Sequence, residues 1–378
     1  MTESTKKNIF KILESPYSSD LDKISLSELD QIEEVFSFGR CEFLLKTSNL
    51  LRNFPLQKRK KLENFIELRE INSLKIFSEF IKLGQVLNSK KIKYIPLKGL
   101  QMNLLTYKNL HLRPIRDIDL LISKESLTPF LECMFSIGYK FKNSDIGPSE
   151  FKYSDYRYDI PVLINKKGVH VETHLRVIDE RFNEMIFEKS YEKKYSDNLS
   201  FNFMSNEDLI IHLIYHATVK NGFDNGVVSI FDVVSILRNN KISYFDLINR
   251  ADTLGLKKNV CCFLSMLNLR FAGLKIEQNF LIDENNLNLK NYEDLILLNY
   301  ADKFSFRLFN NKKISKAFSR NAFLSESQGS KVGLKNLFGR IFRIAASLLK
   351  TIFSISMNKR FRVDVKRVHE INRYLDEK

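Results

Sequence analysis

Hydrophobic residues recur at helical spacing in two parts of the chain. Between about residues 21 and 89, apolar side chains return every three or four positions, as at Ile71, Leu74 and Phe77. We therefore expect several helices there. A second helical region begins at Ser205–Asp208, where a serine followed three residues later by an acid has the form of a capping box. We expect at least four helices from there to about residue 275.

The segment between these two regions contains short runs with the alternation typical of strands. A helix from about Lys124 to Ile137 should end before Gly138, because glycine often follows a helix C-terminus. Asn165–Gly168 supplies turn residues between two alternating runs, which indicates a hairpin. The expected strands are Ile92–Leu97, Ile118–Ile122, Tyr139–Lys142, Tyr158–Ile164 and Val169–Leu175.

These patterns predict an α+β protein in which a small mixed β-sheet is flanked by N-terminal helices and a C-terminal helical domain. Thirteen glycines and seven prolines are few for 378 residues, which favours helices over a strand-rich sandwich. The expected boundaries are 1–89 for the N-terminal helical region, 90–200 for the sheet-containing core, 201–280 for the helical domain and 281–378 for a basic helical C-terminal region.

The net charge of +15 indicates polyanionic partners such as nucleotides, nucleic acid or an anionic lipid surface. Lysines that only contact water produce the same value. The four cysteines show no spacing typical of a zinc site or a disulfide framework, which favours a reducing compartment. The N-terminus has no long apolar run, so we expect a cytoplasmic protein without a signal peptide or a membrane span.

The basic C-terminal region is most pronounced in residues 331–367, which hold ten Lys or Arg and one acid, Asp364. Apolar side chains within Leu337–Phe353 would form one face of a helix. Such a helix can make peripheral contact with an anionic membrane, or its apolar face can pack on the rest of the protein. It cannot span a bilayer, because Arg343 and Lys350 interrupt a run already shorter than the roughly 20 residues needed.

Asp117 and Asp119 are the strongest candidates for chemistry. They are two positions apart in an expected strand, so both side chains should project from one face while Ile118 faces the other. Carboxylates about 5–6 Å apart repel each other by roughly 3 kcal/mol at an effective dielectric constant near 20, which favours a bound cation. Oxygen ligands of this kind suit Mg²⁺. Such pairs also occur in surface strands that bind no metal.

Glu172 is a candidate third acid. Alternation along Val169–Leu175 places it on a polar face together with His170 and His174. From that face Glu172 can complete a three-carboxylate site, ligate one Mg²⁺ and help to deprotonate an attacking hydroxyl. The alternative is a solvated edge residue, and spacing alone does not distinguish the two.

Four further residues are candidates for phosphate binding. Lys98 and Gly99 fall in the turn between an expected strand and helix, where free backbone amides can hold a phosphate. Gly99 permits close approach of the backbone, and Lys98 can contact the phosphates. Arg113 and Arg116 precede the acid pair, where a guanidinium can orient carboxylates or clamp a phosphate. We favour a structural role for Arg116 and leave the role of Arg113 open.

His212 and His216 are four residues apart and should share one face of a helix. The sequence lacks the glutamate and third ligand that a zinc-protease motif requires. We therefore expect these histidines to serve packing or hydrogen bonding in the helical domain.

The order of these residues resembles the uncharacterised bacterial nucleotidyltransferases of the DNA polymerase β superfamily. The resemblance extends over roughly residues 70–275. It is carried by Tyr94–Leu100, Tyr107, Arg113–Ile122, Gly138–Tyr139 and Val171–His174, and farther on by Leu213–His216, Phe231–Val234 and Tyr244–Ile248.

The resemblance implies a nucleotidyltransferase core at 90–200 that uses Mg²⁺, with Mn²⁺ as the alternative. It implies transfer of a nucleoside monophosphate from a triphosphate such as ATP to an unidentified hydroxyl on a small molecule, sugar, protein or RNA. In the implied mechanism one ion activates the hydroxyl and a second steadies the departing pyrophosphate. The residues so implied are Asp117, Asp119 and Glu172 for the metals and catalysis, and Lys98, Gly99, Arg113, Arg116 and His174 for the nucleotide.

This chain departs from the superfamily pattern at Lys98–Gly99, where better-studied members have a Gly-Ser turn whose serine contacts phosphate. Two other functions are compatible with the same fold. One is a toxin-like or defence-associated transferase that modifies tRNA or protein, and the other is a non-catalytic protein that binds nucleotide or RNA. The intact set of three acids favours an enzyme.

Overall fold

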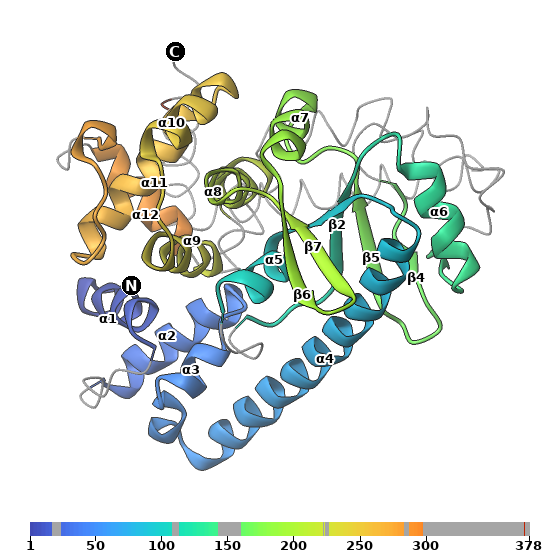
Figure 1. The fold of residues 1–378 in the computed structure, drawn as a ribbon. Coiled ribbons are helices and arrows are strands. Elements are labelled where there is room, and N and C mark those ends of the chain that lie inside the picture. The colour runs from blue at the N-terminus through green and yellow to red at the C-terminus, as the bar shows by residue number, and fades with distance from the viewer. Residues whose placement is uncertain are drawn as a thin grey trace, which may run out of the picture.

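The helices from the two ends of the described chain lie on one side of the molecule, and the main β-sheet lies on the other (Figure 1). The long helix α4 runs diagonally from the N-terminal helices along the sheet. The computed structural model describes residues 1–16, 24–107, 113–142, 160–221, 223, 227–282, 287–297 and 374. The basic segment 331–367 therefore lies outside the described residues, and its expected helix stays a prediction.

The N-terminal part is helical, as its hydrophobic spacing predicted. A capping box starts the second helix, because the Ser25 hydroxyl accepts from the Glu28 backbone N–H while the Glu28 carboxylate accepts from the Ser25 N–H. The fourth helix is a single element of 34 residues. The helices are α1 (Glu3–Glu14), α2 (Leu26–Phe38), α3 (Phe43–Thr47), a 3₁₀ turn (Leu50–Asn53) and α4 (Leu56–Ser89).

The main sheet has the strand order β1-β2-β5-β4-β3, in which β2 and β5 are parallel and the other pairs are antiparallel. The five strands all fall within the ranges expected from the sequence, and the α+β class is confirmed. The elements of this part are β1 (Tyr94–Pro96), α5 (Lys98–Leu105), β2 (Ile118–Ile122), α6 (Leu127–Ser136), β3 (Lys140–Phe141), β4 (Leu163–Ile164) and β5 (His170–His174).

Two of the expected turns form for the anticipated reasons. Gly138 follows α6 with φ +87°, the left-handed conformation that glycine adopts readily. In the hairpin between β4 and β5, the Asn165 side-chain oxygen accepts from the backbone N–H groups of Lys167 and Val169, each at 3.0 Å. Gly168 completes this turn with φ +75°. These local contacts fix the direction in which β5 returns along the sheet.

The sequence did not lead us to expect three elements that follow the sheet. They are α7 (Glu180–Lys189) and a separate hairpin of β6 (Tyr191–Ser196) and β7 (Leu199–Phe203). The signal for β7 was available, because its residues alternate between buried and half-buried positions. Its buried Phe201 stacks on Phe80 of α4 at 4.9 Å between ring centroids. The hairpin thereby packs against the long helix.

The second helical region begins where the sequence predicted, because the Ser205 hydroxyl accepts from the Asp208 backbone N–H at 3.1 Å. At least four helices were expected up to about residue 275, and α8, α9, α10 and α11 confirm this. The elements are α8 (Asn206–Tyr215), a π-helical turn (His216–Lys220), α9 (Val228–Asn239), α10 (Tyr244–Thr253), α11 (Lys257–Arg270) and α12 (Leu287–Leu297).

Among the residues that the structure describes, buried apolar side chains form two clusters. One unites the sheet with the C-terminal half of α4, α6 and the β6–β7 hairpin. The other joins α1–α3 to α8–α12, as in the edge-to-face contact of Phe10 with Phe271 at 5.6 Å between centroids. Lys6 of α1 also pairs with Asp294 of α12. The two helical regions therefore share one core, although the domain boundaries themselves stay a prediction.

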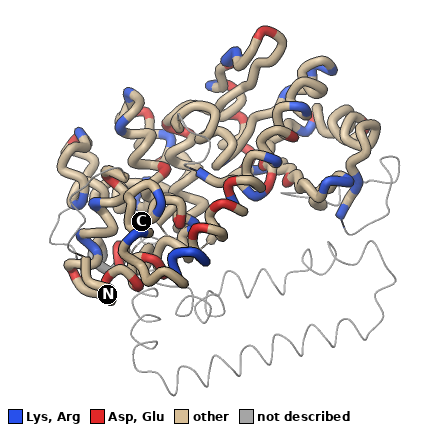
Figure 2. The backbone as a smooth tube through the Cα atoms, turned by 90° about the horizontal axis from the view of Figure 1, so that it is seen from below, with Lys and Arg blue, Asp and Glu red and all other residues tan. Residues whose placement is uncertain are grey.

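Most of the chain's net positive charge lies in residues 298–378, of which the structure describes only residue 374. Residues 298–378 contain eighteen Lys and Arg against six Asp and Glu, whereas residues 1–297 contain forty-two against thirty-nine. Basic and acidic positions are interspersed over the described chain (Figure 2). Within that described part, no helix combines the length and apolarity needed to cross a membrane.

Candidate active site

The acid centre lies where β2 and β5 run side by side. In their parallel register Asp119 pairs with Glu172, so the two carboxylates come from adjacent strands at the same level. Asp117 directly precedes β2 and lines the same cavity as the other two acids. Ligand atoms of Asp119, Glu172 and His174 all lie within 4.8 Å of one another. The structure thus brings together the three acids that the sequence singled out.

Two side chains contact the same oxygen of the Asp119 carboxylate. The Lys98 ammonium lies 2.7 Å from Oδ1 of Asp119, and Nε2 of His174 lies 2.8 Å from the same oxygen. Burial acts to raise the pKa of Asp119, but Lys98 and His174 outweigh it and hold that pKa well below its usual range. Asp119 is therefore an ionised, immobilised carboxylate.

Asp117 has the opposite electrostatic environment. Burial, together with the nearby negative charges of Asp119 and Glu172, raises its pKa to about 6. Lys98 and Arg116 counter this effect only in part. The three carboxylates thus carry more negative charge than the neighbouring ammonium neutralises, which is the condition that favours a divalent cation.

The turn between β1 and α5 positions Lys98 as the sequence predicted. Lys98 adopts φ +50°, a conformation that is unusual for a residue with a side chain, and the Leu97 N–H donates to the Asp119 carbonyl at 3.0 Å. Gly99 lines the cavity, so its contact with a phosphate stays a prediction, and it also has a packing role. A Cβ added there would lie 2.9 Å from a methyl group of Ile115. Glycine at this position therefore permits close packing inside the protein.

The position of His174 differs from the one that a contact with the nucleotide would need. Its ring is buried, with 5% of the residue exposed, and it is absent from the residues that line the cavity. It contacts Asp119 from within the sheet. The geometry gives His174 the role of positioning that carboxylate.

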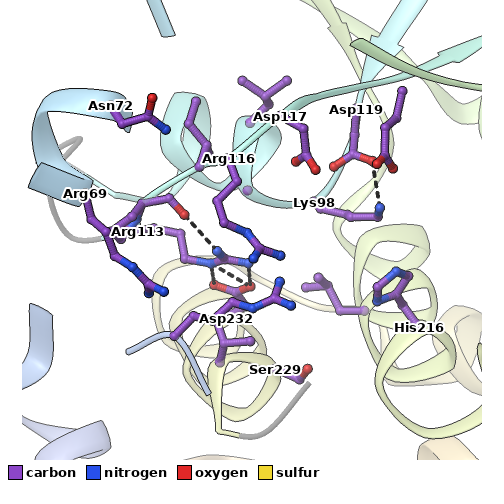
Figure 3. A pocket seen from close by; sticks show the side chains of 18 of the residues that line it. Arg69, Asn72, Lys98, Arg113, Arg116, Asp117, Asp119, His216, Ser229 and Asp232 are labelled. Carbon is purple, nitrogen blue, oxygen red and sulfur yellow. Dashed lines mark hydrogen bonds and ion pairs between the residues drawn. The ribbon is translucent and has the colours of Figure 1, made fainter. Parts of the chain in front are cut away.

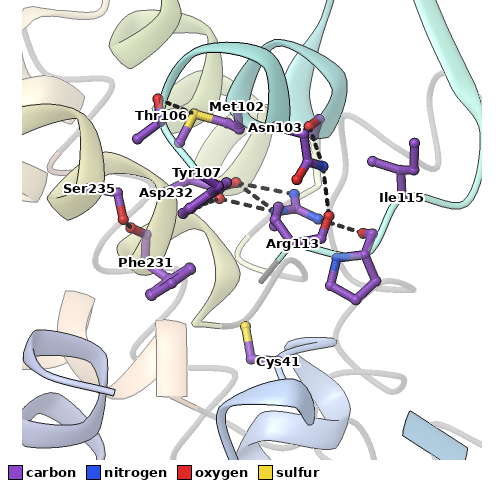
Figure 4. A network of polar contacts seen from close by, with 12 residues as sticks. Cys41, Met102, Asn103, Thr106, Tyr107, Arg113, Ile115, Phe231, Asp232 and Ser235 are labelled. Carbon is purple, nitrogen blue, oxygen red and sulfur yellow. Dashed lines mark hydrogen bonds and ion pairs between the residues drawn. The ribbon is translucent and has the colours of Figure 1, made fainter. Parts of the chain in front are cut away.

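Arg113 has the structural role that we had favoured for Arg116. Its Nε lies 3.0 Å from Oδ1 of Asp232, its Nη2 lies 3.1 Å from Oδ2, and Tyr107 donates its hydroxyl to the same carboxylate at 2.7 Å (Figure 4). Asn103 donates to the Arg113 carbonyl at 2.7 Å. This network ties the segment ahead of β2 to α9. The side chain of Arg116, by contrast, is exposed at the cavity.

The cavity has a volume of about 510 Å³ and two chemically different walls. Asp117, Asp119 and Lys98 converge at one wall, and Arg116 lies between them and the Arg113–Asp232 pair (Figure 3). Asn72 and Arg69 of α4 extend the other wall. Lining residues that sequence reasoning missed are Arg40, Phe65, Leu68, Arg69, Asn72, His216, Asn221, Ser229 and Asp232.

The helix face shared by His212 and His216 approaches this cavity. His212 is buried, as expected for a packing residue, and its ring meets that of His216 edge-to-face at 6.1 Å. His216 also lines the cavity, which we did not expect. Burial, reinforced by the charge of Lys98, lowers the pKa of both rings well below the usual value. Both imidazoles are therefore neutral at physiological pH.

Comparison with known proteins also indicates a nucleotidyltransferase. The profile of a family described as uncharacterised nucleotidyltransferases matches residues 44–272, which is more than half of the chain. No curated protein matches the sequence. A solved structure described as an antigenic nucleotidyltransferase-like protein from Paracoccidioides brasiliensis is 15% identical, with a match that covers 50% of this chain and 93% of that one. Its TM-score is 0.32, too low to carry any argument about this chain.

Proposed function

The chain belongs to the family of uncharacterised nucleotidyltransferases, and on that premise we propose that it transfers a nucleoside monophosphate from a nucleoside triphosphate to an acceptor hydroxyl. The observation that carries the proposal is the parallel register of β2 and β5, which places Asp119 beside Glu172. Asp117 adds a third carboxylate at the same cavity. Family membership alone would not identify the reacting residues, and this arrangement supports their assignment to the three acids.

Asp117, Asp119 and Glu172 would hold the divalent metal, Mg²⁺ or Mn²⁺. Their oxygen donors and the raised pKa of Asp117, to about 6, fit a cation at this place. When bound, such an ion supplies Lewis-acid stabilisation of the charge that develops on the phosphates and makes the acceptor hydroxyl more acidic.

The chain's own residues divide the remaining tasks. His174 and Lys98 hold Asp119 ionised and fixed, which keeps the metal ligand in one orientation. Glu172 is half-buried and lines the cavity, so it can accept the proton of the acceptor hydroxyl.

The direct test compares ATP labelled at the α-phosphate with ATP labelled at the γ-phosphate. The purified protein is incubated with Mg²⁺ and, separately, with RNA, protein and metabolite pools from its native cell. The proposal predicts that α-label enters one pool while pyrophosphate is released. Transfer of γ-label would instead identify a kinase. Absence of any transfer by a protein that binds ATP in a thermal-shift assay would favour a non-catalytic binding protein.

The pool that takes the label also separates the candidate acceptors. Label in tRNA or in a protein would support a toxin-like or defence-associated modifying enzyme, whereas label in the metabolite fraction would support a biosynthetic transferase. The other three α-labelled nucleotides, offered in the same way, would identify the preferred base.

A further inference from the structure

Five cations line the cavity, and three of them are already engaged. Lys98 pairs with Asp119 at 2.7 Å, Arg69 pairs with Glu42 at 2.7 Å, and Arg113 binds Asp232. The remaining two, Arg40 and Arg116, have no ion-pair or hydrogen-bond partner for their guanidinium groups among the residues that the structure describes. The cavity therefore presents two arginines whose charge is available to a ligand.

These arginines repel each other. Although Arg40 is exposed, desolvation of its guanidinium by the surrounding chain lowers its pKa to about 10, and the positive charges of Arg116 and Arg113 contribute to the same shift. An anion bound between the guanidinium groups would relieve that repulsion. The acids that line the same cavity also repel one another, and a bound cation would relieve that repulsion.

The arginines do not simply reflect a basic surface. Residues 1–297 contain forty-two Lys and Arg against thirty-nine Asp and Glu, so this part of the chain is almost neutral. Two arginines that line one cavity without an ion-pair or hydrogen-bond partner among the described residues are a local departure from that balance. Arginine is also the side chain best suited to bidentate contact with phosphate oxygens.

The backbone at Arg40 is held in an unfavourable conformation. Arg40 follows the C-terminus of α2 with φ +58°, and the Cys41 N–H beyond it bonds back to the Phe36 carbonyl at 2.7 Å. Glycine is the usual residue at such a position, because a Cβ is disfavoured there. A side chain has nevertheless been kept, and it lines the cavity. Lys98, which lines the same cavity, is likewise a cation with positive φ.

On the basis of the proposed function, we infer that Arg40 and Arg116 bind the terminal phosphates of the nucleoside triphosphate. In a triphosphate whose inner phosphates lie at the acids, the remaining negative charge extends farther into the cavity, which Arg116 and Arg40 also line. The turn at Lys98 offers no serine hydroxyl for those phosphates, and the Lys98 ammonium is paired with Asp119. Arg40 lies before residue 44, where the family match begins, so the N-terminal helices contribute a substrate contact from outside the matched region.

The test uses Arg40→Gly in the full-length protein. Glycine suits the left-handed conformation, so the melting temperature should stay the same or rise, and a loss of binding cannot then be attributed to misfolding. Dissociation constants for ATP and AMP are measured by calorimetry with Mg²⁺ present. We expect binding of ATP to weaken roughly 10–100-fold, the size of one or two lost charged hydrogen bonds, and binding of AMP to change by less than about threefold. Arg116→Gln should act in the same way.

Arg59→Gln is the matched control, since Arg59 pairs with Glu63 on α4 away from the cavity lining, and it should alter neither constant. Equal weakening for ATP and AMP, or no change for either, would overturn the inference. Normal ATP binding with impaired transfer at saturating ATP would also overturn it, because the arginines would then serve the acceptor. The dissociation constants do not depend on turnover. A protein that binds ATP without transferring label would therefore contradict the proposed function, and the binding of ATP by the two arginines could still be tested.

Discussion

The ammonium of Lys98 lies 2.7 Å from the Asp119 carboxylate, on the same oxygen that His174 contacts at 2.8 Å. The pair joins the first residue of α5 to strand β2, and both side chains are largely buried. A residue expected to serve phosphate binding is therefore also the counter-ion of an expected metal ligand. A substitution of either residue should therefore alter the electrostatic environment of the other.

Lys98→Met should destabilise the metal-free protein and make it more responsive to Mg²⁺. Removing one partner of a buried ion pair typically costs about 3–5 kcal/mol, because the other charge is left uncompensated. The melting temperature in EDTA should fall, and addition of Mg²⁺ should raise it further than in the wild type. Lys75→Met, on the exposed surface of α4, is the control and should show neither effect. An unchanged response to Mg²⁺ would mean that Lys98 and the metal do not share these carboxylates.

Asp117→Asn should stabilise the metal-free protein in a pH-dependent way. Asp117 has a pKa of about 6 in the folded state, above its ordinary value, so the folded protein binds this proton more tightly than the unfolded chain does. Stability is therefore lost as the pH rises from about 4 through 6, and the Asn variant avoids the loss. Chemical denaturation in EDTA should show a gain of about 1–3 kcal/mol at pH 7.5 that disappears near pH 4.

Asp246→Asn, an exposed acid in the first turn of α10, provides the comparison for that experiment and should give no pH-dependent gain. If Asp117→Asn is less stable than the wild type at pH 7.5, then Asp117 is stabilised by a partner that this account omits.

His174→Ala should weaken metal binding more than nucleotide binding. Loss of a group that orients a metal ligand commonly costs about 10–100-fold in metal affinity. Titration with Mn²⁺, followed by electron paramagnetic resonance of the free ion, should show this loss. His174→Gln, which keeps a side chain able to hydrogen-bond to Asp119, should recover part of it. Normal Mn²⁺ affinity together with weakened ATP binding in His174→Ala would instead support the nucleotide contact that the sequence suggested.

Arg113 and Arg116 should differ sharply in their effect on stability. Arg113→Gln breaks a buried pair with Asp232 and should cost about 3–5 kcal/mol in urea denaturation. Arg116→Gln alters an exposed side chain and should stay within about 0.5 kcal/mol of the wild type. If Arg116→Gln destabilises the protein more than Arg113→Gln does, then Arg116 has the structural role.

The elements that the sequence predicted are those set by local signals. The alternation at Ile118–Ile122, the turn at Asn165–Gly168 and the cap at Ser205 each depend on residues close together in the chain. The two aspartates could be found for the same reason, because their spacing is read from one strand. Within the main sheet, local patterns also located all five strands.

The remaining features depend on contacts between distant segments. The register that places Glu172 beside Asp119 is set by the parallel pairing of β2 with β5, which no local pattern specifies. Arg113 and Arg116 are three residues apart in similar surroundings, and only the packing of α9 decides which of them meets Asp232. Arg40 could not be assigned to the cavity either, because the N-terminal helices bring it there through the core that they share with α8–α12.

The most direct test of the central claim measures Mg²⁺-dependent release of pyrophosphate and incorporation of α-label by the wild type, Asp119→Asn and Asp246→Asn in the same cell fractions. Asparagine preserves the shape of the Asp119 side chain while removing its charge, and Asp246 controls for the loss of an acid elsewhere. The account predicts that Asp246→Asn transfers label like the wild type, whereas Asp119→Asn, with its fold verified by circular dichroism, loses at least about a thousandfold in rate, as expected when a principal charge-stabilising group is removed. Transfer by Asp119→Asn at the wild-type rate would contradict it.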